Sequence, residues 1–570
     1  MKHRRHAGQK EAKVTQIEES YVCGASQAPL LYKTIGRALD EAAAAHGDAE
    51  ALIVLHQGIR WTYGELKMRT DRLAAGLLAL GLLPGDRVGI WAPNGAEWVL
   101  TQLATAKAGL ILVSLNPAYR TSEIAHALNL VGVRALVIAE RFKTSDYVAM
   151  LAEVAPELER ERETRLSLGA LPALEWIIQI GRPRLRSMID FASIADAETP
   201  EGLEALRLQE ARNSPDDPVN IQFTSGTTGL PKGATLTHHN ILNNGYFVGE
   251  LMGFGAGDRL CIPVPLYHCF GMVMAVLNCV THGAAMVFPA DSFDPAAVLR
   301  AVEAERCTAL FGVPTMFIAE LAEADFAQFD LTSLRTGVMA GAPCPEPVMR
   351  RVMGEMHMRD VAICYGMTET SPVSFQTRRD SGLQARVGSV GTVHPFIEAK
   401  VVGEDGAILK RGETGELLVR GYSVMRGYWA QADATEAAID QAGWMHTGDL
   451  ATISTSGEAR IVGRLKDMII RGGENVYPAE IENFLIQHPD IIDVAVFGIE
   501  DEKYGEAVCA WLRTSRPLDI EDIREHCRGK IAHYKIPAVI RCVESFPMTV
   551  TGKIRKVEMR EMMAEEATQD

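Results

Sequence analysis

The chain lacks the long hydrophobic runs that a membrane-spanning helix requires. Apolar stretches such as Ala75–Leu83 and Phe270–Val280 fall short of the roughly 18–20 residues that span a bilayer. The 10 cysteines are scattered without a CxxC pair, a usage typical of reduced thiols in a cytosolic protein and not of a disulfide framework. We therefore expect a cytoplasmic protein with no integral membrane segment.

Positive charge is also scarce. Lys and Arg number 57 against 73 Asp and Glu, which gives a formal net charge of −16. This balance disfavours nucleic acid as a partner, although a local basic pocket can still hold a phosphate. The basic start Met1–Arg5 is followed by Glu11, Glu18 and Glu19 without an apolar segment. We therefore expect no secretory signal here, and the acidic residues disfavour a transit peptide.

The 570 residues, 47% hydrophobic and 23% charged, have the composition of a soluble enzyme with more than one domain. β-rich runs alternate with helical patterns, which predicts parallel sheets with helices on their faces. Helices are expected over Thr62–Leu80, where Thr62 and Glu65 have capping-box spacing, and over Gly95–Ala108. The pattern weakens over Leu158–Pro215, where we expect a surface excursion. Strands are expected at Ala51–Leu55, Arg87–Trp91, Leu110–Leu115, Ala135–Ile138, Arg259–Ile262, Ala284–Phe288, Ala309–Val313 and Thr336–Ala340.

The pattern changes after about Thr447, where turn-rich segments precede a compact unit. Pro478 suits the first position of a helix that begins at Tyr477–Glu480. Two β-like runs and a further helix then predict a small α+β domain; they are Val494–Phe497, Ala507–Leu512 and a helix near Ile520–Ile531. We place the linker at Leu465–Lys466, so that the domains are residues 1–465 and 466–570.

The most informative segment is a loop rich in glycine and hydroxyl groups, which follows the apolar run Val219–Phe223 and precedes a helix starting near His238–Asn240. Glycines let backbone N–H groups approach an anion, hydroxyls add donors, and a lysine adds positive charge. The Walker pattern requires Ser or Thr after the lysine, but here Gly233 follows Lys232. A carboxylate elsewhere should therefore bind Mg²⁺. The phosphate-binding residues we predict are Thr224, Ser225, Gly226, Thr227, Thr228, Gly229 and Lys232.

This loop resembles the signature of the adenylate-forming (AMP-binding) superfamily of acyl-CoA synthetases, adenylation domains and luciferases. Through Ile221–Leu236 and Pro265–Phe270 the chain is similar to the medium-chain fatty acyl-CoA synthetases. The resemblance implies an α/β fold, with a large N-terminal domain of parallel α/β sheets plus a β-rich subdomain, and a small mobile C-terminal α+β domain. Four further segments match in order, namely Tyr365–Thr370, Thr447–Asp449, Gly463–Asp467 and Thr551–Lys556.

The resemblance implies a reaction in two halves. A carboxylate attacks the α-phosphorus of ATP to give acyl-AMP and pyrophosphate, and the thiol of coenzyme A then displaces AMP. Glu369 would coordinate the Mg²⁺ that bridges phosphate oxygens, and Thr368 beside it would donate a hydrogen bond to the α-phosphate.

The same resemblance places the nucleoside. Tyr365 would stack on adenine, next to a loop of small residues formed by Gly341, Ala342 and Pro343. Asp449 would accept hydrogen bonds from the ribose hydroxyls, and Arg464 would share that end of the nucleotide.

Two further roles are implied for the C-terminal part. Lys553 would bring positive charge to the α-phosphate and the carboxylate during adenylation. The small domain would then rotate about Lys466, withdraw Lys553, and bring up Gly472 and Gly473, which leave room for the pantetheine arm.

The acid-binding pocket leaves alternatives open. His268 would gate this pocket or touch the carboxylate, and a packed structural histidine is the alternative; Cys269 is interpreted as packing. An amino-acid substrate is disfavoured because Val264–Leu277 contains no carboxylate to pair with an ammonium group. Residues such as Met272 favour a flexible alkyl chain, and the resemblance implies a medium-chain fatty acid, with an aryl acid as the alternative. A catalytically silent nucleotide- or CoA-binding protein of the same fold is the other rival, and a homodimer stays open.

Overall fold

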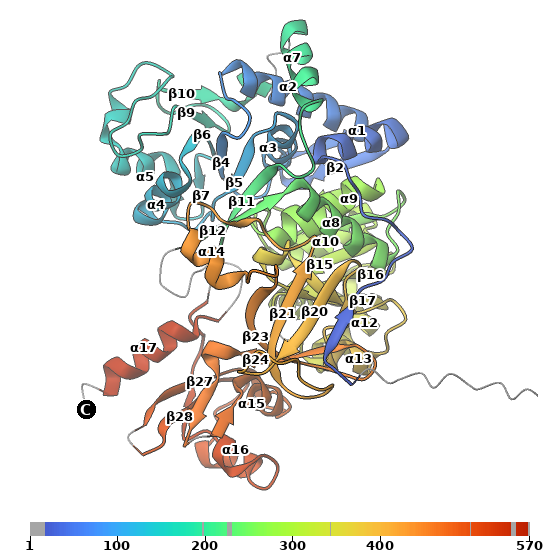
Figure 1. The fold of residues 1–570 in the computed structure, drawn as a ribbon, viewed down its shortest axis with the longest axis vertical. Coiled ribbons are helices and arrows are strands. Elements are labelled where there is room, and N and C mark those ends of the chain that lie inside the picture. Colours follow the sequence, from blue (N-terminus) through green and yellow to red (C-terminus); the bar gives the residue numbers. More distant parts are fainter. Residues whose placement is uncertain are drawn as a thin grey trace, which may run out of the picture.

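The computed structural model describes residues 18–195, 199–224, 231–342, 344–472, 474–501, 503–548 and 554–567 (Figure 1). The first large sheet is parallel from β10 to β11, and its last two pairs are antiparallel. Its eight strands lie in the order β10 (Met188–Asp190), β9 (Trp176–Gln179), β6 (Val133–Ile138), β4 (Arg87–Trp91), β5 (Ile111–Ser114), β11 (Pro218–Thr224), β12 (Lys232–Thr237) and β22 (Gly427–Tyr428).

The second large sheet is parallel from β17 to β2 and has antiparallel edges. Its nine strands lie in the order β19 (Thr392–Val393), β18 (Val373–Gln376), β17 (Asp360–Gly366), β16 (Thr336–Ala340), β15 (Ala309–Gly312), β13 (Arg259–Cys261), β14 (Ala285–Phe288), β2 (Glu50–Val54) and β3 (Ile59–Thr62). The predicted parallel α/β character is therefore present in both large sheets.

Helices cover both large sheets, and one continuous apolar core lies between the sheets. That core takes residues from both sheets and from α1 (Ile35–His46), α2 (Tyr63–Ala79), α3 (Ala96–Lys107), α8 (His238–Met252), the π-helix η3 (Phe270–Leu277) and α9 (Asn278–His282). The opposite face of the first sheet carries α4 (Thr121–Val131) and α5 (Tyr147–Val154), and that of the second carries α10 (Pro295–Glu305), α11 (Pro314–Leu321) and α12 (Glu346–Glu355).

Two further sheets of five strands each have mostly antiparallel pairs. The third sheet has the order β1 (Tyr21–Cys23), β20 (Ile397–Val402), β21 (Gly415–Gly421), β23 (Met445–Ile453) and β24 (Ala459–Arg464). The fourth, at the lower end of Figure 1, comprises β26 (Glu474–Val476), β25 (Ile469–Arg471), β28 (Gly505–Thr514), β27 (Ile491–Asp501) and β29 (Val539–Cys542), with α15 (Pro478–Leu485), α16 (Ile520–Cys527) and α17 (Lys556–Ala567). The remaining helices and strands are α6 (Phe191–Ala195), α7 (Pro200–Glu210), α13 (Leu383–Gly388), α14 (Ala432–Ala438), β7 (Arg141–Phe142) and β8 (Ser145–Asp146).

Local predictions have mixed outcomes. The capping box of α2 is confirmed, since Thr62 Oγ1 accepts from the Glu65 N–H and Glu65 Oε2 accepts from the Thr62 N–H. The expected surface excursion over Leu158–Pro215 is wrong, because β9 and β10 extend the first sheet there. Irregularly spaced leucines of this segment pack beneath that sheet, which a periodicity argument does not detect; they are Leu158, Leu166, Leu168, Leu171 and Leu174.

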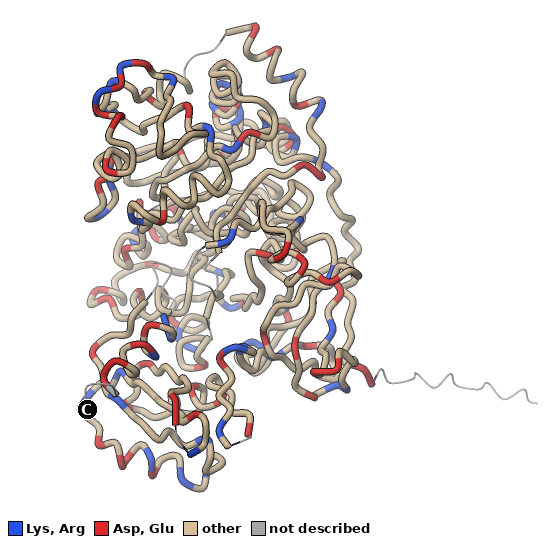
Figure 2. Tube along the Cα trace, turned by 60° about the vertical axis from the view of Figure 1, so that its left-hand side comes forward, with Lys and Arg blue, Asp and Glu red and all other residues tan. Residues whose placement is uncertain are grey.

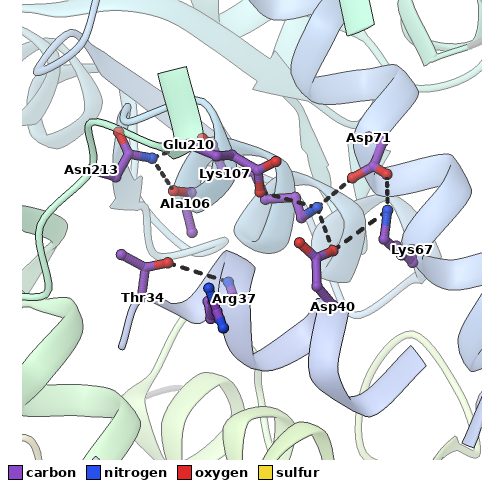
Figure 3. A network of polar contacts seen from close by, with 9 residues as sticks. All are labelled: Thr34, Arg37, Asp40, Lys67, Asp71, Ala106, Lys107, Glu210 and Asn213. Atoms are coloured by element: carbon purple, nitrogen blue, oxygen red, sulfur yellow. Dashed lines mark hydrogen bonds and ion pairs between the residues drawn. The ribbon is translucent and has the colours of Figure 1, made fainter. Parts of the chain in front are cut away.

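Charges are distributed over the whole molecule. Figure 2 shows acidic and basic residues interspersed along the coloured trace. Lys107 at the end of α3 is among the buried charged residues, and it joins four helices by ion pairs to Asp40 of α1, Asp71 of α2 and Glu210 of α7 (Figure 3). Among the described residues no helix has the length and apolar character needed to cross a bilayer.

Candidate active site

Three residues predicted to bind the nucleoside meet at the end of β17. The Tyr365 hydroxyl donates to Asp449 Oδ2 over 2.6 Å, and Arg464 Nε lies 3.0 Å from Asp449 Oδ1. Antiparallel pairing of β23 and β24 places Asp449 directly opposite Arg464. Burial, with the negative charge of Asp449, raises the pKa of Tyr365 well above its usual value. Its phenol therefore keeps its proton and acts as a donor to the carboxylate.

Glu369 follows the same strand in a short helical turn, η5 (Thr368–Thr370). Its side chain is buried, with 6% of the residue exposed, and its Oε1 accepts from the Tyr428 hydroxyl over 2.8 Å. Gly366 allows the chain to turn here, because a Cβ at this position would lie 1.7 Å from the carbonyl oxygen of Pro372. The end of β17 therefore carries both the nucleoside cluster and the predicted metal ligand.

Two of the predicted phosphate-binding residues lie on the paired strands β11 and β12, a hairpin that the sequence pattern did not predict. Thr224 ends β11 and pairs with Lys232, the first residue of the unpredicted strand β12, and α8 then begins at His238 as expected. Lys232 Nζ lies 5.1 Å from the centroid of the Tyr428 ring. Tyr428 therefore connects the hairpin to Glu369. The predictions for Ser225, Gly226, Thr227, Thr228 and Gly229 lie outside the described residues.

His268 and Thr368 are joined through the residue between them in space, Cys269. Its Sγ lies 3.8 Å from His268 Nδ1 and 3.7 Å from Thr368 Oγ1. The Phe270 N–H donates to His268 Nδ1 over 3.2 Å, so this ring nitrogen acts as an acceptor and the other one carries the proton. The segment predicted to border the acid pocket therefore contacts η5.

Polar side chains as well as apolar ones contact the residues next to His268 and the start of η3. Gln222 Nε2 donates to the Tyr267 carbonyl over 2.8 Å and lies 3.6 Å from Met272 Sδ. Gln102 Nε2 donates to the Met272 carbonyl over 3.0 Å. These bonds anchor the start of the π-helix η3, an irregular helix type that is frequent at functional sites.

The other predicted residues that the structure describes lie partly beside the second sheet and partly in the fourth sheet. Gly341, with φ at +90°, and Ala342 follow β16, which pairs with β17 one step before Tyr365. Gly472 lies in the turn between β25 and β26, where its N–H donates to the Tyr504 carbonyl over 2.7 Å. Pro343, Gly473 and Lys553 lie outside the described residues.

A divalent cation fits beside Glu369 only if other ligands complete its shell. Among the described residues no group of three or more His, Cys, Asp or Glu side chains could hold a metal ion. A single buried carboxylate suits Mg²⁺ in nucleotide sites, because the cation keeps several waters and takes the remaining oxygens from phosphates. Tyr428 was missed at the sequence level, and the only local signal is a glycine–tyrosine pair after Met425 and Arg426.

This fold and this arrangement of hydroxyls, carboxylates and lysine define an adenylate-forming enzyme. The chain belongs to the AMP-binding enzyme family, whose profile matches residues 39–429, and the AMP-binding enzyme C-terminal domain matches residues 480–553. The mouse (Mus musculus) mitochondrial medium-chain acyl-CoA ligase ACSF2 is 43% identical over 551 residues, which cover 95% of this chain and 90% of that protein. The putative acyl-CoA synthetase YngI of Bacillus subtilis (strain 168) is 44% identical, with coverage of 94% and 98%.

Solved structures of similar proteins include ligands of the expected kind. The anthranilate CoA ligase AuaEII in complex with anthranoyl-AMP has a TM-score of 0.83 and 26% identity, and the match covers 95% of this chain and 99% of that one. ATP-bound MatB from Rhodopseudomonas palustris has a TM-score of 0.79 and 28% identity, with coverage of 92% and 98%. The predicted superfamily, fold class and enzyme class, an AMP-forming acid–CoA ligase that uses ATP, Mg²⁺ and coenzyme A, are confirmed by these matches.

Proposed function

We propose that this protein converts a medium-chain fatty acid into its CoA thioester through an acyl-AMP intermediate. The observation that carries the proposal is the close succession of Tyr365 and Glu369 at the end of β17. Tyr365 belongs to the cluster with Asp449, and Glu369 connects through Tyr428 to Lys232. One ATP molecule can therefore place its nucleoside at the Tyr365–Asp449 cluster and its phosphates at the cluster of Glu369 and Lys232.

Each group then has a task in adenylation. Asp449, whose two carboxylate oxygens are oriented by Tyr365 and Arg464, would accept the ribose hydroxyls. Thr224 and Lys232 would hold the β- and γ-phosphates, and Thr368 would donate to the α-phosphate. Mg²⁺ held by Glu369 would supply charge neutralisation as pyrophosphate leaves. His268, which accepts the Phe270 N–H at Nδ1, would contact the acid.

The second half-reaction assigns a role to the C-terminal part. We place the domain boundary between residues 465 and 466, and Lys466 lies in η6 (Leu465–Asp467), between the last strand of the third sheet and the first strand of the fourth. Rotation there would withdraw Lys553 and bring the turn containing Gly472 and Gly473 to the acyl-AMP. The glycines would leave room for the pantetheine arm.

The choice of acid follows the relatives and the lining of the pocket. ACSF2 carries the medium-chain name, and Met272 and Met274 are buried in η3, where flexible thioethers adapt to an alkyl chain. An aryl acid is the second candidate, because AuaEII binds anthranoyl-AMP. A panel that separates alkyl from aryl substrates therefore decides between them.

The test is pyrophosphate release and CoA thioester formation from acetate, hexanoate, octanoate, decanoate, palmitate, benzoate and cinnamate. We expect a maximum of kcat/KM among hexanoate, octanoate and decanoate, and no pyrophosphate release without acid. A maximum on benzoate or cinnamate would transfer the assignment to an aryl-acid ligase. ATP binding without acid-dependent pyrophosphate release from any acid would support the catalytically silent alternative.

Two finer statements belong to the same proposal. We propose a cytoplasmic location, although the ACSF2 relatives are named mitochondrial, and we propose that a homodimer forms. Fractionation of the source cells and light scattering of the purified enzyme test them. A membrane-enclosed fraction or a monomeric mass would contradict the respective statement.

A further inference from the structure

A tyrosine outside the predicted motifs touches both groups on the phosphate side of the site. The hydroxyl of Tyr428 donates to Glu369 Oε1 over 2.8 Å. Its ring faces Lys232, whose Nζ lies 5.1 Å from the ring centroid, a distance at which an ammonium is attracted to the negative face of the ring. One side chain therefore contacts the proposed metal ligand and the proposed phosphate-binding lysine.

The backbone of Tyr428 is held from two sides. On one side β22 pairs with β12, and the Trp429 N–H donates to the Gly233 carbonyl over 2.8 Å. On the other side the Tyr428 N–H donates to Thr435 Oγ1 of α14 over 2.9 Å. Gly427 has φ at +142°, and a Cβ there would lie 2.8 Å from Thr435 Cγ2, so a side chain would push α14 away. The position of the ring is therefore determined by the fold and not by the ligand.

Glu369 is held at both ends by this same segment. The Met425 N–H donates to the Glu369 carbonyl over 2.8 Å, while Tyr428 holds the carboxylate. The Glu369 carboxylate is buried, and a buried carboxylate requires hydrogen-bond donors. A hydrogen bond to a charged acceptor is also stronger than one between two neutral groups. Because an ionised carboxylate only accepts hydrogen bonds, the Tyr428 hydroxyl is the donor in this contact.

We propose that Tyr428 is a positioning residue for the metal–nucleotide complex. Its hydroxyl orients the Glu369 carboxylate toward the cation, and its ring keeps the Lys232 ammonium beside the polyphosphate. The inference rests on the proposed function, since it takes Glu369 and Lys232 as the metal-binding and phosphate-binding groups. Tyr428 acts through these two side chains.

The test separates the hydroxyl from the ring. Tyr428→Phe removes only the hydroxyl, so the affinity for Mn²⁺ in the presence of a non-hydrolysable ATP analogue should fall about five- to tenfold. Free Mn²⁺ is measured by electron paramagnetic resonance, and affinity for the metal-free analogue in EDTA should change less than about twofold. Tyr428→Leu also removes the ring, so it should weaken metal-free binding by a further factor of about two to five.

The controls exclude a general loss of stability. Tyr147 is a buried tyrosine with one hydrogen bond to a carbonyl, that of Pro117 over 2.7 Å, and Tyr147→Phe should leave Mn²⁺ affinity unchanged. In a Glu369→Gln background, Tyr428→Phe should change Mn²⁺ affinity by less than about twofold, because the two residues act as a pair. Because the cycle compares the same change in two backgrounds, it measures the coupling between Tyr428 and Glu369 even if Tyr428→Phe lowers the melting temperature.

Two results would overturn the inference. One is wild-type Mn²⁺ affinity in Tyr428→Phe, and the other is an undiminished effect of that change in the Glu369→Gln background. Acid-dependent pyrophosphate release by the wild-type enzyme is measured separately. Its absence, together with the expected Mn²⁺ effects, would reject the proposed function and leave the positioning role of Tyr428 intact.

Discussion

Replacing Lys107 by methionine should destabilise the N-terminal part of the molecule by about 3 kcal/mol. Lys107 is 1% exposed, and its Nζ lies 2.8 Å from Asp40 Oδ1, 2.5 Å from Asp71 Oδ1 and 3.1 Å from Glu210 Oε1 (Figure 3). The three carboxylates come from α1, α2 and α7, and the lysine comes from α3. Methionine keeps most of the apolar stem, so the variant chiefly removes the charge.

The size of the expected loss in stability follows from how exposed the three carboxylate partners of Lys107 are. Removing one member of a buried pair costs about 3–5 kcal/mol. The lower end applies because the carboxylate side chains are 17–36% exposed and Lys67 Nζ still lies 2.5 Å from Asp71 and 3.5 Å from Asp40. For a cooperative unit of roughly 400 residues, 1 kcal/mol corresponds to about 1 °C, so the melting temperature should fall by about 3 °C.

The pH dependence of this loss has a defined sign. Burial alone would lower the pKa of Lys107, but Asp71, Glu210 and Asp40 together raise it, so the wild-type cation is present at neutral pH. Burial already raises the pKa of Glu210 above 4.5 despite Lys107. Without the lysine the native Glu210 carboxyl group binds its proton more tightly than the unfolded one, so the variant regains stability as the pH falls.

Differential scanning calorimetry of Lys107→Met at about pH 5 and about pH 8 tests the reasoning, and the deficit should be larger at the higher pH. Lys67→Met is the matched control. Lys67 shares Asp40 and Asp71 but has a side chain 36% exposed, so its removal should cost no more than about 1 kcal/mol. Equal losses for the two variants, or a deficit for Lys107→Met that does not change with pH, would refute the argument.

Two further predictions concern single side chains. Glu320 in α11 is fully buried, and neither of its carboxylate oxygens has a hydrogen-bond partner among the described residues. Burial raises the pKa of Glu320. Glu320→Leu should therefore stabilise the protein by about 1–2 kcal/mol near pH 8 and by less near pH 5. The same change at the half-buried Glu323 is the control. A gain in stability for Glu320→Leu that does not increase with pH would contradict the argument that the buried carboxyl group titrates. Lys553→Ala should lower acid-dependent pyrophosphate release by about 100-fold, while thioester formation from supplied acyl-AMP stays within about threefold. Equal loss in both assays would contradict the proposed division of labour.

Sequence patterns predicted most of the parallel strands, although not β9, β10 or β17, and the success has a physical reason. Strands such as Arg87–Trp91 and Thr336–Ala340 are covered on both faces, so they appear as short continuous apolar runs between helices. The strand Lys232–Thr237 was missed because its polar start belongs to the phosphate loop and its end merges into the cap of α8. A local pattern reports burial of a segment, but it does not report which neighbour the segment pairs with.

The same limit applies to the candidate site. Tyr365, Asp449 and Arg464 were found because each lies in a recognisable segment, yet their contact depends on the third sheet placing β23 beside the end of β17. Tyr428 shares no segment with Glu369, and β22 has only two residues, too few for any periodicity. Its role arises from three separate pieces of chain, namely the β12 hairpin, the η5 turn and α14. A side chain that acts by joining such pieces can be recognised only when the pairing of strands is known, and for this reason the double-mutant cycle with Glu369 is the decisive measurement of what Tyr428 does.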